Sequence, residues 1–562
     1  MASTGLQALI LCGPGSSFPT FTSNPDENPK ALLPIANRPM VWYPIDYCLR
    51  TGITSITLIC PSSASQALTA AFNTSPYLTS LPSPRPDILA CAGLDQNMGT
   101  AEILRLDEVR GLVTGDFIVL PCDLVCEPTG EQLLQAWMVK SANLAHTLRA
   151  SRLTNGAESR HNGGLGVWYD TKTSAPVKGE ETDFIATAPL PAAPVPHPKG
   201  SILPDLARLV YSVPTDSLND LMEERKGLPF RHGLLRAHPR LRVHTTHRDA
   251  HIYVFPRWIL DFVRENEHFE SIAEDVVGWW AKAGWQPRLA DKLHFREVCG
   301  DDDNGRLADA DAETGSVADS NAVPSEAGPD AQADRRKSSG DLSPRGVPTI
   351  ATNGPPEPAL PAVEPPPILA HIHPSKAQQE PGSILRRVDT AQLLLAVSLQ
   401  LAKLPSVEEV GPEAASPFAH PRKIAFPEGV KSRTTITKQD SLIGENVTVE
   451  EKTSIKECII GANCQIQEGA KLSQCLLMEG VVVGKGCKLT KCILGKRCVI
   501  GDGSVLTDCE VQENLLVEER TEDKENRLMS SDGLEASQAE MDEVLHEMDQ
   551  EVAATLGDTA MD

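Results

Sequence analysis

A strict seventeen-residue period in the C-terminal third of this 562-residue chain constrains its fold more than any other feature. Aliphatic residues there follow one another at steps of six, six and five positions, and the pattern repeats four times. Three steps of about six residues per period are typical of a triangular parallel β-helix, in which each coil supplies three short strands. We therefore predict a β-helix over residues 424–517. One column in register consists of Ile443, Ile460, Leu477, Leu494 and Val511.

A column of cysteines follows the same period, at Cys458, Cys475, Cys492 and Cys509. The first of them stands two positions before Ile460, so both side chains should point to the inner face. We expect a ladder of small apolar thiols, because buried cysteine usually behaves as a small hydrophobe. A metal or redox ladder is the alternative. The 14 cysteines of the chain include no CxxC pair, which favours free thiols in a reducing compartment.

Residues 1–300 alternate apolar, strand-like runs with helix-like segments. The clearest strands span 6–12, 55–60 and 117–120, and the expected helices span 39–50, 64–72 and 99–109. Such alternation predicts an α/β, Rossmann-like domain with a parallel sheet and helices on both faces. Ligands of these sheets bind beyond the carboxyl ends of the strands. The loop at 12–30 and the turn at Asp123 should therefore face one crevice.

Composition changes sharply after residue 300. Residues 301–382 are acidic and proline-rich with few large apolar residues, so we predict a disordered insert. We expect a helical linker at 383–423 and an acidic tail at 518–562, where 15 acidic residues outnumber 3 basic ones. The formal net charge of the chain is −24. This charge argues against nucleic acid and anionic membranes as partners, and no apolar run is long enough to span a bilayer.

A Gly-rich loop that starts at residues 13–16 and ends in Pro29-Lys30 precedes the motif QNMGTA at 96–101 and Asp123 at the end of a strand. Together these motifs resemble those of the sugar-nucleotide pyrophosphorylases. Members of that family share a Gly-rich phosphate loop that ends in Pro-Lys, a Gly-Thr-Ala turn beside the nucleotide base and an Asp that binds magnesium. The resemblance implies a nucleotidyltransferase-like fold, with Asp249 at a second position beside the metal. It also implies a relic nucleotide pocket, formed by Gly13, Gly15, Lys30, Gln96, Gly99, Thr100 and Asp123.

Departures from the family pattern argue against catalysis. The arginine that stabilises the pyrophosphate in active members is Ser17 here, and losing one such donor costs on the order of 100- to 1000-fold in rate. The longer loop carries Asp26 and Glu27, which we expect to lie where the triphosphate should sit. His251 stands where active members usually have glycine beside the sugar. We therefore expect no catalytic residue, no metal site and no cofactor.

One branch of this superfamily, the gamma and epsilon subunits of eukaryotic translation initiation factor 2B, combines such a domain with a left-handed β-helix of hexapeptide repeats. Residues 29–53, 249–263 and 268–280 resemble the gamma subunits. Epsilon subunits carry a further helical domain beyond the β-helix, which performs guanine-nucleotide exchange. The acidic tail occupies that place here, so the resemblance is to gamma.

The resemblance implies a non-catalytic, cytosolic subunit of the complex that exchanges GDP for GTP on translation initiation factor 2. Its implied partners are the epsilon subunit, the alpha, beta and delta regulatory subunits, and initiation factor 2 itself. The alternative is an active sugar-nucleotide pyrophosphorylase of the GDP-mannose type, supported by the surviving Lys30 and Asp123. A β-helix acyltransferase would need a catalytic histidine on its coils, and residues 424–517 contain none.

Overall fold

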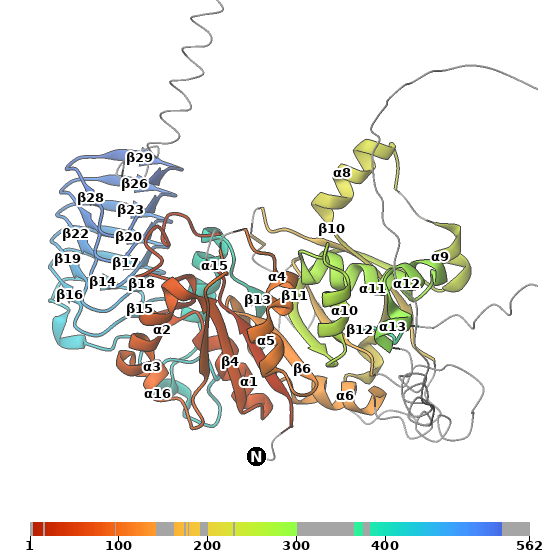
Figure 1. Ribbon diagram of the computed structural model, residues 1–562. Coiled ribbons are helices and arrows are strands. Elements are labelled where there is room, and N and C mark those ends of the chain that lie inside the picture. The colour runs from red at the N-terminus through yellow and green to blue at the C-terminus, as the bar shows by residue number, and fades with distance from the viewer. Residues whose placement is uncertain are drawn as a thin grey trace, which may run out of the picture.

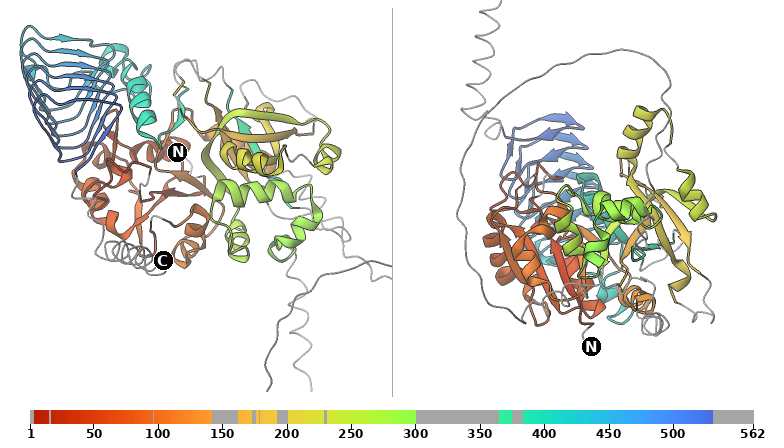
Figure 2. Two further views of the ribbon diagram at one scale, coloured as in Figure 1. Left: turned by 90° about the horizontal axis from the view of Figure 1, so that it is seen from above. Right: turned by 45° about the vertical axis from the view of Figure 1, so that its right-hand side comes forward.

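The computed structural model describes residues 4–14, 17–95, 97–141, 162–172, 176–177, 179–191, 201–228, 231–299, 365–374 and 383–530. An α/β unit built on a nine-stranded sheet stands beside a β-helix, and Figure 1 shows the two in contact along one side. Helix α15 (Ala391–Ala402) lies between them, as the view from above in Figure 2 also shows.

Nine strands form the central sheet: β1 (Gln7–Leu11), β4 (Ser55–Pro61), β5 (Asp87–Cys91), β6 (Phe117–Pro121), β8 (Leu165–Asp170), β9 (Asp183–Pro189), β10 (Leu206–Pro214), β11 (Arg242–Phe255) and β12 (Leu369–Ile372). Their order is β5-β4-β1-β6-β11-β8-β12-β10-β9. The first four are mutually parallel, as predicted. The remainder is mixed, because β11 runs antiparallel to both β6 and β8. β9 likewise runs antiparallel to its neighbours β10 and β11.

Side chains of β1 alternate between two apolar cores. Ala8 and Ile10 face the core that contains α1 (Trp42–Thr51), α2 (Ser62–Thr74) and α15. Leu9 and Leu11 face the core that contains α5 (Asp107–Leu112), α10 (Ile259–Glu265) and α11 (Gly278–Ala283). Helices thus cover both faces, as predicted. The helix expected at 99–109 is split, because Leu106 adopts an extended conformation between α4 (Thr100–Arg105) and α5.

One strand of the central sheet comes from the segment that the sequence analysis assigned to a disordered insert. β12 lies between β8 and β10 and is parallel to β8. Its neighbourhood is apolar enough to join the core, since Ile368, Leu369 and Ala370 are all buried. The prediction of disorder over 301–382 is therefore wrong at β12. Residues 301–364 and 375–382 lie outside the described residues.

The linker expected to be helical from residue 383 begins as a strand. β13 (Leu385–Arg387) pairs antiparallel with β7 (Leu124–Cys126), which follows β6 directly. Helix α15 starts only after Thr390, whose hydroxyl accepts a hydrogen bond from the Leu393 amide. Further along, Arg38 donates hydrogen bonds to the carbonyls of Phe418 and Ala419 at 2.8 and 2.7 Å, which fixes this part of the linker on the α/β unit.

The predicted parallel β-helix is present, and strands one period apart pair directly, such as Ile443 with Ile460. Its coils extend past the predicted end at 517, because Glu522–Lys524 and Arg527–Leu528 add a further coil with mostly polar residues. The three sheets are β14 (Thr435–Ile436), β17 (Ser454–Lys456), β20 (Lys471–Ser473), β23 (Lys488–Thr490), β26 (Val505–Thr507), β29 (Glu522–Lys524); β15 (Leu442–Ile443), β18 (Ile459–Ile460), β21 (Leu476–Leu477), β24 (Ile493–Leu494), β27 (Glu510–Val511), β30 (Arg527–Leu528); and β16 (Thr448–Val449), β19 (Gln465–Ile466), β22 (Val482–Val483), β25 (Val499–Ile500), β28 (Leu516–Val517).

The cysteine column points into the β-helix, as predicted. Its four members are buried, and each sulfur lies within hydrogen-bonding distance of the backbone carbonyl two residues earlier. All 14 cysteines are buried and free. Among the described residues no group of three or more His, Cys, Asp or Glu side chains is placed to hold a metal ion. The column therefore packs as a set of small apolar groups. It consists of Cys458, Cys475, Cys492 and Cys509.

A second aliphatic column faces outward from the β-helix and joins it to the α/β unit. Its members stand directly before the inward residues of one sheet, and they belong to the same apolar core as α1 and α15. Because these side chains are buried against residues of the α/β unit, one apolar core runs across the boundary between the two units. The column consists of Leu442, Ile459, Leu476 and Ile493.

No helix in the described part of the chain is both long enough and apolar enough to cross a membrane.

Truncation of one inward residue should loosen the β-helix. Leu477 is fully buried, so we expect Leu477→Ala to destabilise the surrounding coils by about 2–5 kcal/mol through lost burial and a residual cavity. Hydrogen exchange of the amides in β18, β21 and β24 should then accelerate. The exposed Lys488→Ala, on a neighbouring coil, serves as the control. Equal exchange rates in both variants would contradict the assignment of Leu477 to the interior.

Candidate functional site

Two residues of the predicted relic nucleotide pocket, Lys30 and Asp123, lie near the carboxyl ends of β1 and β6. Lys30 begins a short 3₁₀ turn (Lys30–Leu32), and Asp123 stands between β6 and β7. The Lys30 ammonium nitrogen is 2.7 Å from Oδ2 of Asp123, and the two side chains retain only 14% and 2% of their exposure. The structure therefore brings these two predicted site residues together, but it pairs them with each other.

A second cation reaches Asp123 from the linker. The guanidinium Nε of Arg387, on β13, lies 3.6 Å from Oδ1 of Asp123, and its terminal nitrogen lies 3.3 Å from Asp389. The backbone supports this approach, since the Val388 amide donates to the Asp123 carbonyl at 2.8 Å. Sequence reasoning missed Arg387, although the pair of arginines before an apolar helix was a visible signal.

The charges of this cluster stabilise one another. Burial alone would raise the pKa of Asp123, but Lys30 and Arg387 outweigh it and lower that pKa to about 2. Burial alone would likewise lower the pKa of both cations, and the Asp123 charge raises it instead. A magnesium-binding carboxylate has to offer free oxygens. Oδ2 of Asp123 is bonded to Lys30, and Oδ1 faces Arg387 at 3.6 Å without a hydrogen bond.

The second carboxylate beside the expected metal position is also engaged. Asp249 accepts hydrogen bonds from the Tyr253 hydroxyl and from the His251 amide, the latter at 2.8 Å. The Asp249 amide donates to Asp183 at 2.5 Å. Burial raises the pKa of Asp249, and the neighbouring Asp183 charge raises it further. This position therefore favours a protonated carboxyl group rather than an ionised metal ligand.

His251 fills the position that glycine usually occupies in the resembling family. Its φ of 52° lies in the left-handed region, which glycine adopts easily and a histidine rarely does. The side chain contacts the Tyr253 ring and lies near Asp123. Burial lowers the pKa of His251 well below its usual value, so the imidazole is neutral.

Two pocket residues pack against a neighbouring loop. The Thr100 hydroxyl accepts a hydrogen bond from the Ile272 amide at 2.9 Å, and the Ala101 amide donates to the Glu270 carbonyl at 2.8 Å. A Cβ atom on Gly99 would lie 2.2 Å from that carbonyl oxygen, so only glycine fits there. Gly13 follows β1 with open space around its Cα. Gly15 and Gln96 lie outside the described residues.

The long loop between Ser17 and Lys30 is held by the β-helix. Thr20 donates to Glu510 at 3.0 Å, and Lys496 donates to Asn28 at 2.6 Å. Asp26 and Glu27 are exposed, and Glu27 is close enough to Lys496 to influence its pKa. Contacts of Thr20 and Asn28 with the β-helix therefore hold both ends of the segment that carries these two acids.

Known proteins resemble this chain in two comparisons, one with family models and one with curated proteins. Residues 427–522 match the family model described as the EIF2B subunit epsilon LbH domain, and the parallel sheets of this segment fit a left-handed β-helix. Among curated proteins, the chain is 28% identical over 280 residues to "Translation initiation factor eIF2B subunit gamma" of Schizosaccharomyces pombe, which covers 50% of this chain and 52% of the relative.

Proteins of the same name from two other organisms are also similar. The identity is 22% over 273 residues for Caenorhabditis elegans, covering 48% of this chain and 57% of the relative. It is 24% over 273 residues for Dictyostelium discoideum, covering 48% and 54%. The chain therefore spans about half the length of the curated relatives it matches.

Removal of the Asp123 charge should leave two buried cations without a partner. We expect Asp123→Asn to lower the free energy of unfolding of the α/β unit by roughly 3–5 kcal/mol. The double variant Asp123→Asn/Arg387→Met should recover part of this loss. Urea unfolding followed by tryptophan fluorescence reports on this unit, because all 7 tryptophans lie between residues 42 and 285. The control is Asp220→Asn, which removes an exposed charge from the same α/β unit. An unchanged transition in Asp123→Asn would contradict the ion-pair cluster.

The Asp183–Asp249 pair should make stability depend on pH. Burial raises the pKa of both, so the folded state binds more protons than the unfolded state. Their contribution is fully present below the unfolded pKa of about 4 and is lost as the pH rises toward neutrality. We expect the unfolding temperature to fall over this range and Asp183→Asn to flatten the decline. The exposed Asp216→Asn should leave the slope unchanged; the same slope in both variants would contradict the prediction.

Proposed function

We propose that this chain is a non-catalytic, gamma-type subunit of the guanine-nucleotide exchange factor that acts on translation initiation factor 2 in the cytosol. The observation that carries the proposal is the occupation of Asp123 by Lys30 and Arg387 in a chain similar to proteins named eIF2B subunit gamma. The degenerate nucleotidyltransferase fold then serves as a scaffold, and the exchange itself belongs to an epsilon-type partner.

The charge arrangement argues against the alternative, an active pyrophosphorylase of the GDP-mannose type. Phosphoryl chemistry of this kind depends on cations that meet the developing charge of the pyrophosphate. Ser17 is exposed and offers no such cation, and Lys30 is committed to Asp123 at 2.7 Å. An incoming triphosphate would have to break that buried ion pair and move His251.

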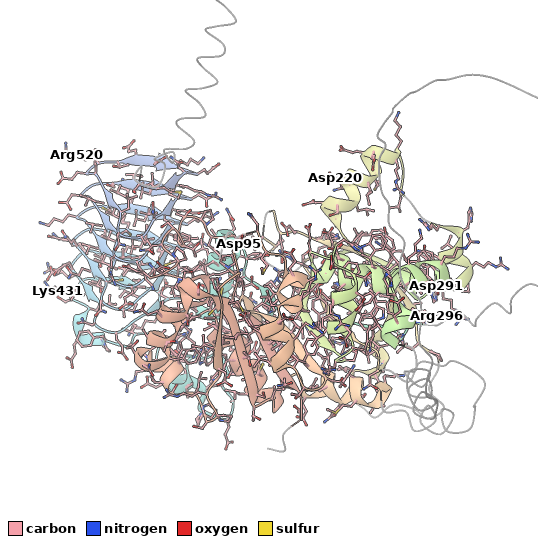
Figure 3. All side chains as sticks on the ribbon, viewed as in Figure 1. Asp95, Asp220, Asp291, Arg296, Lys431 and Arg520 are labelled. Carbon is pink, nitrogen blue, oxygen red and sulfur yellow. The ribbon has the colours of Figure 1, made fainter. Side chains whose placement is uncertain are left out.

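The last coils of the β-helix offer a surface for the proposed epsilon partner. Leu516, on β28, is 70% exposed, and Met529, beyond β30, is 44% exposed. The terminal coil also leaves strand edges that can pair with another chain. Figure 3 shows Arg520 at this end of the β-helix and Lys431 at the opposite end. The proposed partners further include the alpha, beta and delta regulatory subunits and initiation factor 2.

Affinity purification at moderate salt, followed by intact-complex mass spectrometry, tests the proposal. We expect an epsilon-type subunit and initiation factor 2 to co-purify with the tagged chain. Leu516→Asp should reduce recovery of the epsilon-type subunit several-fold by placing a charge in the interface, whereas Lys431→Asp at the opposite end should not. Recovery only of copies of this chain with a bound sugar nucleotide would reverse the conclusion in favour of the enzyme.

A further inference from the structure

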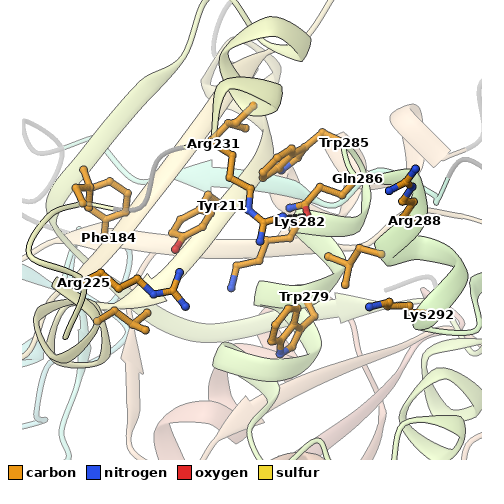
Figure 4. A pocket seen from close by; sticks show the side chains of 14 residues that line it. Phe184, Tyr211, Arg225, Arg231, Trp279, Lys282, Trp285, Gln286, Arg288 and Lys292 are labelled. Carbon is orange, nitrogen blue, oxygen red and sulfur yellow. Dashed lines mark hydrogen bonds between the residues drawn. The ribbon is translucent and has the colours of Figure 1, made fainter. Parts of the chain in front are cut away.

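A cavity of about 470 Å³ opens on the part of the α/β unit that carries helix α8 (Thr215–Arg225), helix α9 (His232–Ala237), α11 and α12 (Pro287–Lys292). Figure 1 places these helices away from the β-helix, and Figure 4 shows the side chains that line the cavity. Its volume lies within the range of 300–1,000 Å³ that is typical of small-molecule sites.

Five cationic side chains line this cavity. In the described part of the chain, none of them forms an ion pair with an Asp or Glu side chain, although the chain carries a net charge of −24. Arg231 donates a hydrogen bond at 2.9 Å, but its acceptor, the side chain of Gln286, is neutral. Like charges gathered without counter-charges repel one another, so an anion would be stabilised among them. The five are Arg225, Arg231, Lys282, Arg288 and Lys292.

Aromatic side chains form an apolar part of the cavity lining. The ammonium of Lys282 lies 4.6 Å from the centroid of Trp279 and 5.0 Å from that of Tyr211, and Figure 4 shows it directed into the cavity between them. The indole of Trp285 is fixed by a hydrogen bond to the Val210 carbonyl at 2.8 Å. Planar rings of this kind favour a ligand that brings a flat or apolar group as well as charge.

The acids nearest to Lys282 are committed to other groups. Glu274 accepts a hydrogen bond from the Ser217 hydroxyl. Asp275 accepts from the backbone amides of Glu270 and Ser271, both at 3.0 Å. Neither carboxylate forms an ion pair with Lys282, so the ammonium remains available to a ligand.

We infer that this cavity binds a small organic anion of the nucleoside phosphate class, with its phosphates among the five cations and its planar base against the tryptophan rings. The contrast with the relic pocket supports the assignment. The Lys30 cation is neutralised there by Asp123 at 2.7 Å, whereas the cations of the distant cavity have no acidic partner in the described residues. The inference does not depend on the proposed function.

Isothermal titration of the full-length chain with ATP, with GTP and with inorganic tripolyphosphate tests the inference. We expect a nucleotide to bind and tripolyphosphate to bind more weakly, because it lacks a ring. Arg225→Gln/Lys292→Gln should weaken nucleotide binding about tenfold or more by removing charge-assisted contacts. Both side chains are exposed, so the fold should tolerate their replacement.

The control Arg236→Gln/Arg240→Gln removes the same charge from exposed positions that do not line the cavity and should leave affinity unchanged. A second control, Lys30→Gln, separates the two pockets. Loss of nucleotide binding in Lys30→Gln alone would overturn the inference in favour of the relic pocket. The absence of heat with every ligand would overturn the inference. Binding of an acidic peptide with the sequence of residues 531–562, together with no binding of a nucleotide, would overturn it as well.

Discussion

The buried ion-pair cluster around Asp123 links the central sheet to the segment that leads into the β-helix. Asp123 follows the strand β6 in the centre of the sheet, and Arg387 belongs to the segment that leads to the β-helix. Their pairing, with the β13–β7 ladder, fixes where the chain enters α15. Because α15 contacts β18, the same cluster also sets where the β-helix begins. A buried charge without its partners would be costly, so this route of the chain is strongly specified.

The cluster changes the chemistry of the fold as well as its architecture. In a nucleotide-binding site, cations and carboxylates stay free until substrate and metal arrive. Here Lys30 pairs with Oδ2 of Asp123, and His251 lies beside them. Cations that form no ion pair with an acid in the described residues line the cavity around Lys282, at the β10–β9 edge of the sheet. Within the described residues, the cations near Asp123 are therefore paired with acids of the same chain, whereas those lining the cavity around Lys282 are not.

Contacts with the β-helix explain the length of the loop between Ser17 and Lys30. The outward column that begins at Leu442 and continues at Ile459 gives way to Glu510 one coil after its last aliphatic member, and Glu510 accepts the hydrogen bond from Thr20. Apolar burial therefore joins the units near the start of the β-helix, and polar contacts with the loop continue the interface along it. Asn28 and its partner Lys496 extend these contacts. In the sugar-nucleotide pyrophosphorylases that it resembles, this loop would cover phosphates. In this chain it contacts the β-helix through Thr20 and Asn28.

Local periods in the sequence are enough to predict the β-helix, its inward columns and the layered α/β unit, because each strand and helix repeats them. The outward column that contains Leu476 follows the same period, but its contact with the α/β unit came from the folded structure. So did the approach of Arg387 to Asp123, the entry of β12 into the sheet from a proline-rich segment, and the exposure of Asp26 and Glu27. Long-range pairing of single charges leaves no periodic signal, because one contact between distant segments depends on how every intervening element packs.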